Sequence, residues 1–192
     1  MKINAAPRIL IVAGVCIAAL VGLVISEGAA RAGGQEVRLP MEAVDPRALL
    51  SGHYVVVDLR QRLAPGQQCP TGEGDWIALR PEGDHHTVAG AAPSRERAQQ
   101  VGPLPVKGGF SCSEPVEDAD GEMVRPAFVA LDLDIHRFHI NQTDAERIER
   151  VLREQRPDDA TRAFAIVSVG RDGRARLKGV EIDGERLELS WL

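Results

Sequence analysis

The sequence predicts an α+β domain of mainly antiparallel β structure, sheet or barrel-like, with one docked helix, preceded by an N-terminal transmembrane helix. Three observations lead to this prediction: an uncharged apolar run near the N-terminus, many short β-forming segments after it, and one long amphipathic helical pattern. About 155 residues remain after the apolar run and a short linker, the size of one domain with a single core. Because aromatic residues make up 4% of the chain, that core must be mainly aliphatic.

The apolar run extends from Ile9 to Ile25 without a charged residue, and Glu27 returns the chain to polar composition. At ~1.5 Å rise per residue, a helix of this length reaches about 25 Å, the lower limit for crossing a bilayer. Lys2 and Arg8 precede the run, and a basic flank stays in the cytoplasm. The expected order is a cytoplasmic N-terminus (1–8), a transmembrane helix or uncleaved signal anchor in the lipid bilayer (9–26), a linker (27–35) and a periplasmic domain (36–192).

A cleaved secretory signal is the alternative, since Ala30-Arg31-Ala32 has the small-x-small pattern of a cleavage site. The apolar run is longer than the core of a signal peptide, which spans about 7–15 residues. We therefore favour a retained anchor. Both interpretations place the residues after Ala32 on the far side of the membrane.

Charge and cysteine usage narrow the class of protein. The net charge of −5 and the lack of a basic cluster argue against nucleic-acid binding. Cys69 and Cys112 lie in loop-like contexts of the exported part, and the bacterial periplasm is oxidising, so we expect them to be bridged. The alternative is two unpaired, buried thiols. Cys16, within the apolar run, is interpreted as a small packing residue.

The segment after the linker predicts a strand, a turn and a second strand. Glu36 to Met41 alternates polar and apolar residues, which is typical of a strand. Asp45-Pro46 then predicts a helix cap followed by proline at the first helical position. A single turn over Arg47 to Leu50 ends at Gly52, which reverses the chain. Tyr54 to Leu59 is a β-branched run and predicts a core strand.

The middle of the chain predicts three further β segments. A hairpin is expected from Asp75 onward, around Pro81-Glu82-Gly83-Asp84, because proline and glycine preset turn dihedrals. Pro103 to Phe110 is expected to form a strand with a glycine break. Pro126 to Ile135 alternates apolar and polar residues and predicts a half-buried strand.

One helix and two hairpins are expected towards the C-terminus. Thr143 to Glu146 has the pattern of a capping box, and the helix that it begins should end before Pro157. The turn Arg171-Asp172-Gly173 then joins two strands, and Asp183-Gly184 joins the second of these to a third. The expected total is eight or nine strands.

The stretch "VDPRALLSGHYVVVDL" resembles the signature of the GDYXXLXY family of bacterial membrane-anchored proteins, whose function is uncharacterised. The matching positions are Asp45, Pro46, Arg47, Gly52, Tyr54 and, conservatively, Val57. His53 and Leu59 depart from the signature. Later segments resemble the family's in the same order, over most of residues 37–184. The resemblance implies an inner-membrane protein with a periplasmic domain and a membrane protein partner, and it transfers no catalytic residue.

Asp132, Asp134 and His136 are the candidate site residues, because their side chains are ligand types for a transition metal. On a regular strand they share one face, about 6.6 Å apart per pair. A solvent-facing polar row is the alternative. The favoured function is therefore a non-catalytic binding or accessory module without a cofactor, and the second hypothesis is a metal-assisted or acid–base enzyme that uses these three residues.

Overall fold

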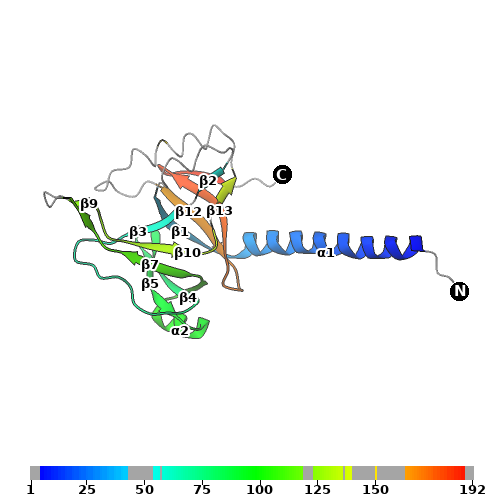
Figure 1. Cartoon of the computed structure of the whole chain (residues 1–192), viewed down its shortest axis with the longest axis horizontal. Helices are drawn as coiled ribbons and strands as arrows, with labels where there is room; N and C mark the ends of the chain where they lie inside the picture. The colour runs from blue at the N-terminus through cyan, green and yellow to red at the C-terminus, as the bar shows by residue number, and fades with distance from the viewer. Residues whose placement is uncertain are drawn as a thin grey trace.

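The computed structural model describes residues 5–42, 54–56, 58–118, 123–135, 137–139, 150 and 163–188. Helix α1 (Ala5–Gly33) leaves the β domain on one side (Figure 1). Its span Arg8–Gly33 is long and apolar enough to cross a membrane, and the rest of the structure does not bury it. The helix is therefore consistent with a single-pass membrane anchor. It includes most of the expected linker, and β1 begins at Gln35.

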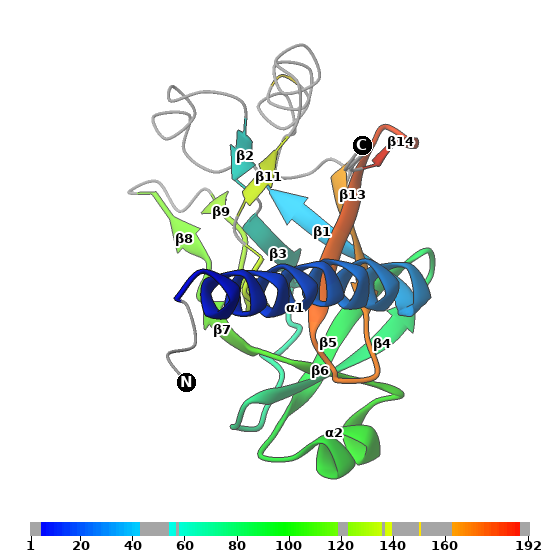
Figure 2. The same cartoon turned by 90° about the vertical axis from the view of Figure 1, so that its right-hand side faces the viewer.

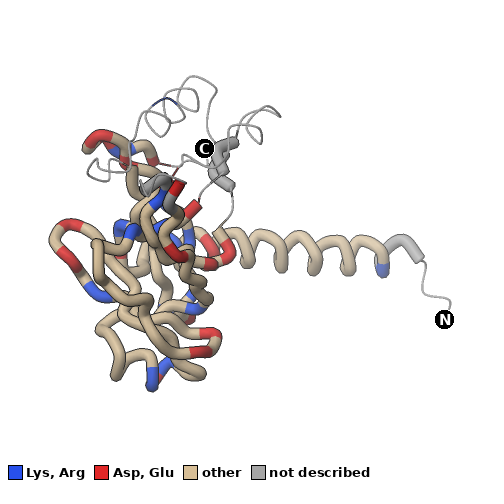
Figure 3. Tube along the Cα trace, turned by 60° about the vertical axis from the view of Figure 1, so that its left-hand side comes forward, with Lys and Arg blue, Asp and Glu red and all other residues tan. Residues whose placement is uncertain are grey.

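Charged residues of both signs are spread over the domain, whereas most of α1 carries none (Figure 3). This difference is what a helix in lipid and a domain in water require. The hydrocarbon core offers nothing to solvate a charge, whereas a water-facing surface is stabilised by mixed charges.

The described part of the chain contains 14 strands and a second helix, α2 (Arg95–Val101). The strands are β1 (Gln35–Glu42), β2 (Tyr54–Val56), β3 (Asp58–Arg62), β4 (Trp76–Glu82), β5 (His85–Ala92), β6 (Leu104–Lys107), β7 (Gly109–Ser113), β8 (Val116–Glu117), β9 (Met123–Arg125), β10 (Phe128–Asp132), β11 (Arg137–His139), β12 (Ala163–Val169), β13 (Ala175–Ile182) and β14 (Glu185–Glu188). The expected eight or nine strands were too few, because several of these strands have only two or three residues and no readable alternation.

The sheets are antiparallel throughout the described strands, so the predicted fold class is confirmed. A seven-stranded sheet has the order β14-β13-β12-β1-β3-β10-β7, and a three-stranded sheet has the order β5-β4-β6. The pairs β11-β2 and β8-β9 form two small sheets. The large sheet ends at β14 and β7 and the described strands close no barrel, so the sheet form of the prediction holds. Figure 2 shows α1 crossing in front of this arrangement, with α2 at the far end of the three-stranded sheet.

The core is aliphatic, as the low aromatic content required. Strand β1 lies between β12 and β3 and buries Val37, Leu39 and Met41 completely. Every residue of β12 is buried, which explains its nearly continuous apolar sequence. Ile77 and Leu79 of β4 belong to the same core cluster, so the two larger sheets share one hydrophobic core.

The hairpins predicted from turn residues in the sequence are confirmed. Strands β4 and β5 pair, with Gly83 and Asp84 at the turn. Strands β12 and β13 pair across the expected Asp-Gly loop. At the next turn, Asp183 and Gly184 both have positive φ (51° and 79°), the conformation of a two-residue turn that matches strand twist.

Three expectations about this part of the chain need correction or fall outside the described residues. The expected strand from Tyr54 to Leu59 is described on either side of Val57, and the two segments have different partners: β2 pairs with β11, whereas β3 pairs with β1 and β10 in the large sheet. Helix α2 was missed; Ser94 caps it by accepting from the backbone N–H of Arg97. The expected turn at 45–52 and, apart from Arg150, the expected docked helix at 143–157 lie outside the described residues.

The structure joins Cys69 to Cys112 in a disulfide, with Cα atoms 6.1 Å apart, as the sequence predicted. The closed loop contains β4, β5, α2 and β6, so it encloses the whole three-stranded sheet. Cys112 lies on β7, the edge strand of the large sheet. The bridge therefore ties the segment before β4 to the edge of the seven-stranded sheet.

Candidate functional site

A cavity of about 640 Å³ lies where the chain passes from β6 to β7. It is lined by Gly74, Asp75, Lys107, Gly108, Gly109, Asp132, Leu133, Asp134, Arg174 and Ala175. These residues come from the start of β4, the β6–β7 junction, the end of β10 and the loop between β12 and β13. The cavity therefore lies where the two larger sheets meet.

Gly108 makes this junction possible. Its φ of +147° is one that L side chains rarely adopt, and an added Cβ would lie 2.3 Å from the carbonyl oxygen of Asp132. Its N–H donates to the carbonyl oxygen of Asp75 (3.0 Å), and the N–H of Lys107 donates to that of Gly173 (2.8 Å). The end of β6 is thus held between two loops, and the glycine break predicted in this segment is where the chain changes sheets.

Two of the three candidate ligands, Asp132 and Asp134, line the cavity, and His136 lies outside the described residues. The regular strand that would place them in one row is not present, because β10 ends at Asp132 and Asp134 has a φ of +61°. The N–H of Asp134 donates to Oδ1 of Asp132 (3.3 Å), which closes a tight turn. Leu133, 5% exposed, fixes that turn to the core.

The cavity combines three carboxylates with two cations. Asp75 joins Asp132 and Asp134, while Lys107 and Arg174 contribute positive charge. Asp75, Lys107 and Arg174 were not predicted from the sequence as site residues. The local signals in the sequence were Gly108 and the Asp-Gly loop. Glycines of this kind indicate that another segment packs closely against the backbone, but they do not indicate which segment. In the part of the chain that the structure describes, no three His, Cys, Asp or Glu side chains lie close enough to hold a metal ion.

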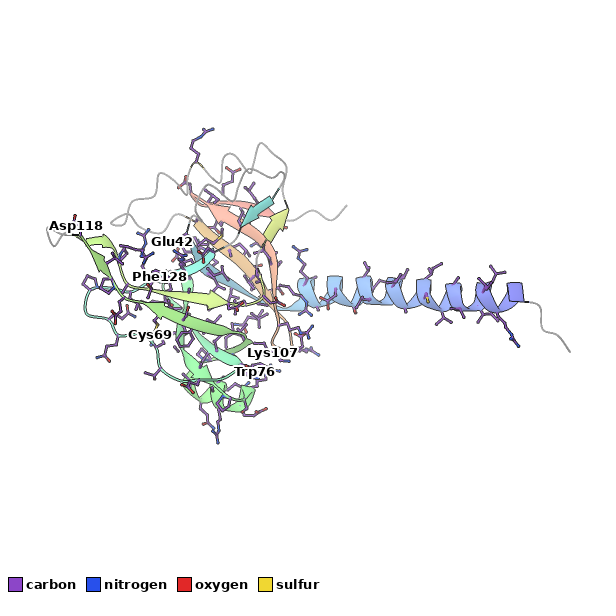
Figure 4. The ribbon with its side chains drawn as sticks, viewed as in Figure 1. Glu42, Cys69, Trp76, Lys107, Asp118 and Phe128 are labelled. Carbon is purple, nitrogen blue, oxygen red and sulfur yellow. A yellow bond between two sulfur atoms is a disulfide. The ribbon has the colours of Figure 1, made fainter. Side chains whose placement is uncertain are left out.

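Trp76 forms one flank of this region. The Nζ atom of Lys107 lies 5.5 Å from the centroid of its ring, and the guanidinium carbon of Arg95 lies 5.8 Å from it. Gly173 packs so closely that an added Cβ would lie 2.4 Å from the ring. Cations placed over an indole ring are attracted by its electron-rich face. Figure 4 shows Trp76 and Lys107 together on the side of the domain from which α1 leaves.

The loop between β12 and β13 also joins the domain to α1. Arg176 donates from Nε to Oε2 of Glu27 (2.7 Å) and from Nη2 to Oε1 (3.2 Å). The same guanidinium bonds Asp172 (Nη2 to Oδ2, 3.0 Å) and so lowers the pKa of that carboxyl to about 2. Only 13% of the Arg176 side chain is exposed. One nearly buried arginine therefore connects the helix, the loop and β13.

Of the signature residues, Tyr54 begins β2, and Asp45, Pro46, Arg47, Gly52 and Val57 lie outside the described residues. The proposed structural role of this motif stays a prediction.

The fold and the site define a class: an antiparallel β domain on a single apolar helix of membrane-spanning length. The sequence profile of the GDYXXLXY protein family matches residues 16–180. The chain belongs to this family, as its sequence indicated. Neither the curated proteins nor the solved structures contain a match.

Proposed function

We propose that the protein is a non-catalytic accessory module: a domain held in the periplasm by α1, which binds and supports a membrane protein partner in the bacterial inner membrane. The observation that carries the proposal is the contact of Arg176 with Glu27. This contact adds a second link between a helix of membrane-spanning length and the sheet, besides the chain connection at Gly34, and so favours a defined position of the domain relative to the bilayer. A defined position is what a module needs in order to meet the extramembrane part of a membrane partner.

Two further observations support the location and the partner. The Cys69–Cys112 disulfide is the kind of bond that persists in an oxidising compartment and is rare in the cytosol. The side chains of α1 from Arg8 to Glu27 are exposed in the structure, and apart from the neighbouring backbone of the helix itself no atom lies within 4 Å of a Cβ added at Gly14 or Gly22. A glycine on a membrane helix allows a second helix to approach closely.

The partner is tested by purifying the tagged full-length chain from membranes in mild detergent and identifying stoichiometric companions by mass spectrometry. We expect a multi-spanning membrane protein that is lost in the Gly14→Leu, Gly22→Leu variant. Val15→Leu with Leu23→Val, which keeps the helix apolar without filling either glycine position, is the control. Recovery of the chain without a stoichiometric companion would contradict the proposal.

The location is tested separately. Protease added to intact spheroplasts should digest the domain, whereas residues 1–8 stay protected. A mature N-terminus at Gly33 would show cleavage and refute the retained anchor while leaving export intact.

A metal-assisted or acid–base enzyme that uses Asp132, Asp134 and His136 is the second candidate, because two of these residues line the cavity. The test is the zinc, manganese and nickel content of the full-length chain purified from cells without added metal. A stoichiometric metal that is lost in Asp132→Asn with Asp134→Asn would favour the enzyme over the accessory module. Glu96→Gln with Glu114→Gln removes two exposed carboxylates that do not line the cavity and is the control.

A further inference from the structure

The loop between β12 and β13 is held beside the point where α1 leaves the bilayer. Glu27, which Arg176 binds, is only two residues beyond Ile25, the last residue of the uncharged apolar run. Arg176 is the second residue of β13, directly after this loop. The loop residues therefore lie near the level of Glu27 along the helix. That level corresponds to the polar headgroup region of a bilayer spanned by the preceding residues.

The arginines at this end of the hairpin outnumber the nearby acids: Arg171, Arg174 and Arg176 face only Glu27 and Asp172 among the described acids beside them, and Arg174 also attracts the Glu27 carboxylate. Arg171 and Arg174 are exposed. Asp172, the acid of the loop, is paired with Arg176, and so is Glu27. Among the described residues, no carboxylate lies within 4.0 Å of the guanidinium nitrogens of Arg171 or Arg174.

Two more cations and an aromatic ring extend the same surface. Arg95 and Lys107 flank Trp76, and Arg95 also donates to the carbonyl oxygen of Arg171. Arg174 and Lys107 line one cavity, and Arg95 and Arg171 line a second, smaller one beside Gly33, at the end of α1. We call Arg95, Lys107, Arg171 and Arg174, with Trp76 between them, the Trp76 patch.

The chemistry of the patch matches a lipid headgroup. Guanidinium groups bind phosphate oxygens through paired hydrogen bonds, and lysine binds them as a point charge. Tryptophan is enriched at membrane–water interfaces, where its ring is apolar and its N–H remains hydrated. The three acids of the larger cavity, Asp75, Asp132 and Asp134, come from the residue before β4 and from the end of β10, and not from the loop that lies beside α1.

We propose that the Trp76 patch binds the phosphate groups of anionic phospholipids in the leaflet that faces the domain, and so holds the domain against the bilayer. This inference rests on the membrane attachment in the proposed function and adds a lipid class and the residues that recognise it. It does not depend on whether a protein partner exists.

The test uses the full-length chain reconstituted in vesicles, with Trp191→Phe so that Trp76 is the remaining tryptophan. Its fluorescence is quenched with a lipid that carries a nitroxide on the headgroup. We compare vesicles of phosphatidylcholine alone with vesicles that also contain phosphatidylglycerol. Quenching is expected to rise about twofold in the anionic vesicles, and the difference should shrink in high salt, which screens exposed charges.

Arg171→Glu with Arg174→Glu should remove the dependence on phosphatidylglycerol. Arg97→Glu with Arg125→Glu, two exposed arginines outside the patch, makes the same change in net charge and should keep it. Urea unfolding midpoints establish that each variant is folded. Equal quenching of Trp76 in the two kinds of vesicle overturns the inference. An equal loss of the dependence on phosphatidylglycerol in the patch variant and in the control variant also overturns it. Failure of the chain to float with vesicles of either composition would instead refute the membrane attachment itself.

Discussion

Removal of the Cys69–Cys112 disulfide should strongly destabilise the domain, because the bridge encloses the three-stranded sheet and α2. The two cysteines are 43 residues apart. A cross-link across that separation removes about 13 cal/mol/K of chain entropy from the unfolded state, or about 4 kcal/mol at 25 °C. For a domain of this size, each kcal/mol shifts the melting temperature by about 2–4 °C, so the expected decrease is about 8–16 °C.

The perturbation is Cys69→Ser with Cys112→Ser, measured by urea and thermal unfolding of the full-length chain in mild detergent. Cys16→Ser is the matched control, since Cys16 lies in α1, is exposed and is not bridged. Reduction of the wild-type chain should reproduce the loss of stability of the double variant, whereas the control should unfold like the wild type.

A loss below about 1 kcal/mol would refute the reasoning, since the chain-entropy term depends only on loop length and not on local contacts. Thiol labelling gives an independent check. In the denatured, unreduced chain, one cysteine should react, and labelling of all three would show that the bridge is absent.

Three further predictions concern single contacts. Gly173→Val should lower the free energy of unfolding by at least about 1 kcal/mol, since φ is +77° and the new Cβ would lie 2.4 Å from the Trp76 ring. Gly184→Val is the control, because Gly184 has a similar φ (+79°) but no neighbouring segment within 4 Å of an added Cβ. Equal urea midpoints for the two variants would exclude the ring contact as the cause. Hydrogen bonds from Arg186 and Lys178 lower the pKa of Glu36 to about 2. This carboxylate should therefore stabilise the fold above its unfolded pKa of about 4.3 and lose that effect as the pH falls towards the folded pKa. Glu36→Gln should flatten the fall of the urea midpoint between about pH 5 and about pH 3, and an unchanged slope would contradict the assignment. Arg176→Gln should release the end of α1 from β13 and so speed amide hydrogen exchange at residues 29–34. Lys178→Gln, the control, should leave that exchange unchanged. Equal exchange rates in both variants would show that Arg176 does not hold the helix.

Features that depend only on neighbouring residues can be predicted from the sequence. The length and lack of charge of Ile9 to Ile25 are sufficient to predict a helix of membrane-spanning length. Asp183-Gly184 and the loop at 171–173 specify turns because glycine accepts positive φ at little cost. The disulfide followed from counting, since the chain after the apolar run contains just two cysteines. The order of the segments also indicated the family.

The partners of each strand were decided by the tertiary structure. Nothing in Glu36 to Met41 states that β1 pairs with β12, about 130 residues later, and with β3 on its other side. The run from Tyr54 to Leu59 was read as one strand because its composition is uniform, yet its two halves pair with different strands. The composition of a segment indicates that it can form a half-buried strand, but it does not indicate which strands it pairs with.

The candidate site shows the same division. Asp132 and Asp134 were found because their side chains are recognisable ligand types, but their expected row required a strand that ends at Asp132. Asp75, Lys107 and Arg174 reach the cavity only because three loops converge at Gly108. Hydrophobic burial brings such distant segments together, and burial depends on the area that all sheets cover jointly and not on any local pattern. Local chemistry therefore specified the turns and the anchor, while the packing of the two larger sheets against each other specified the cavity.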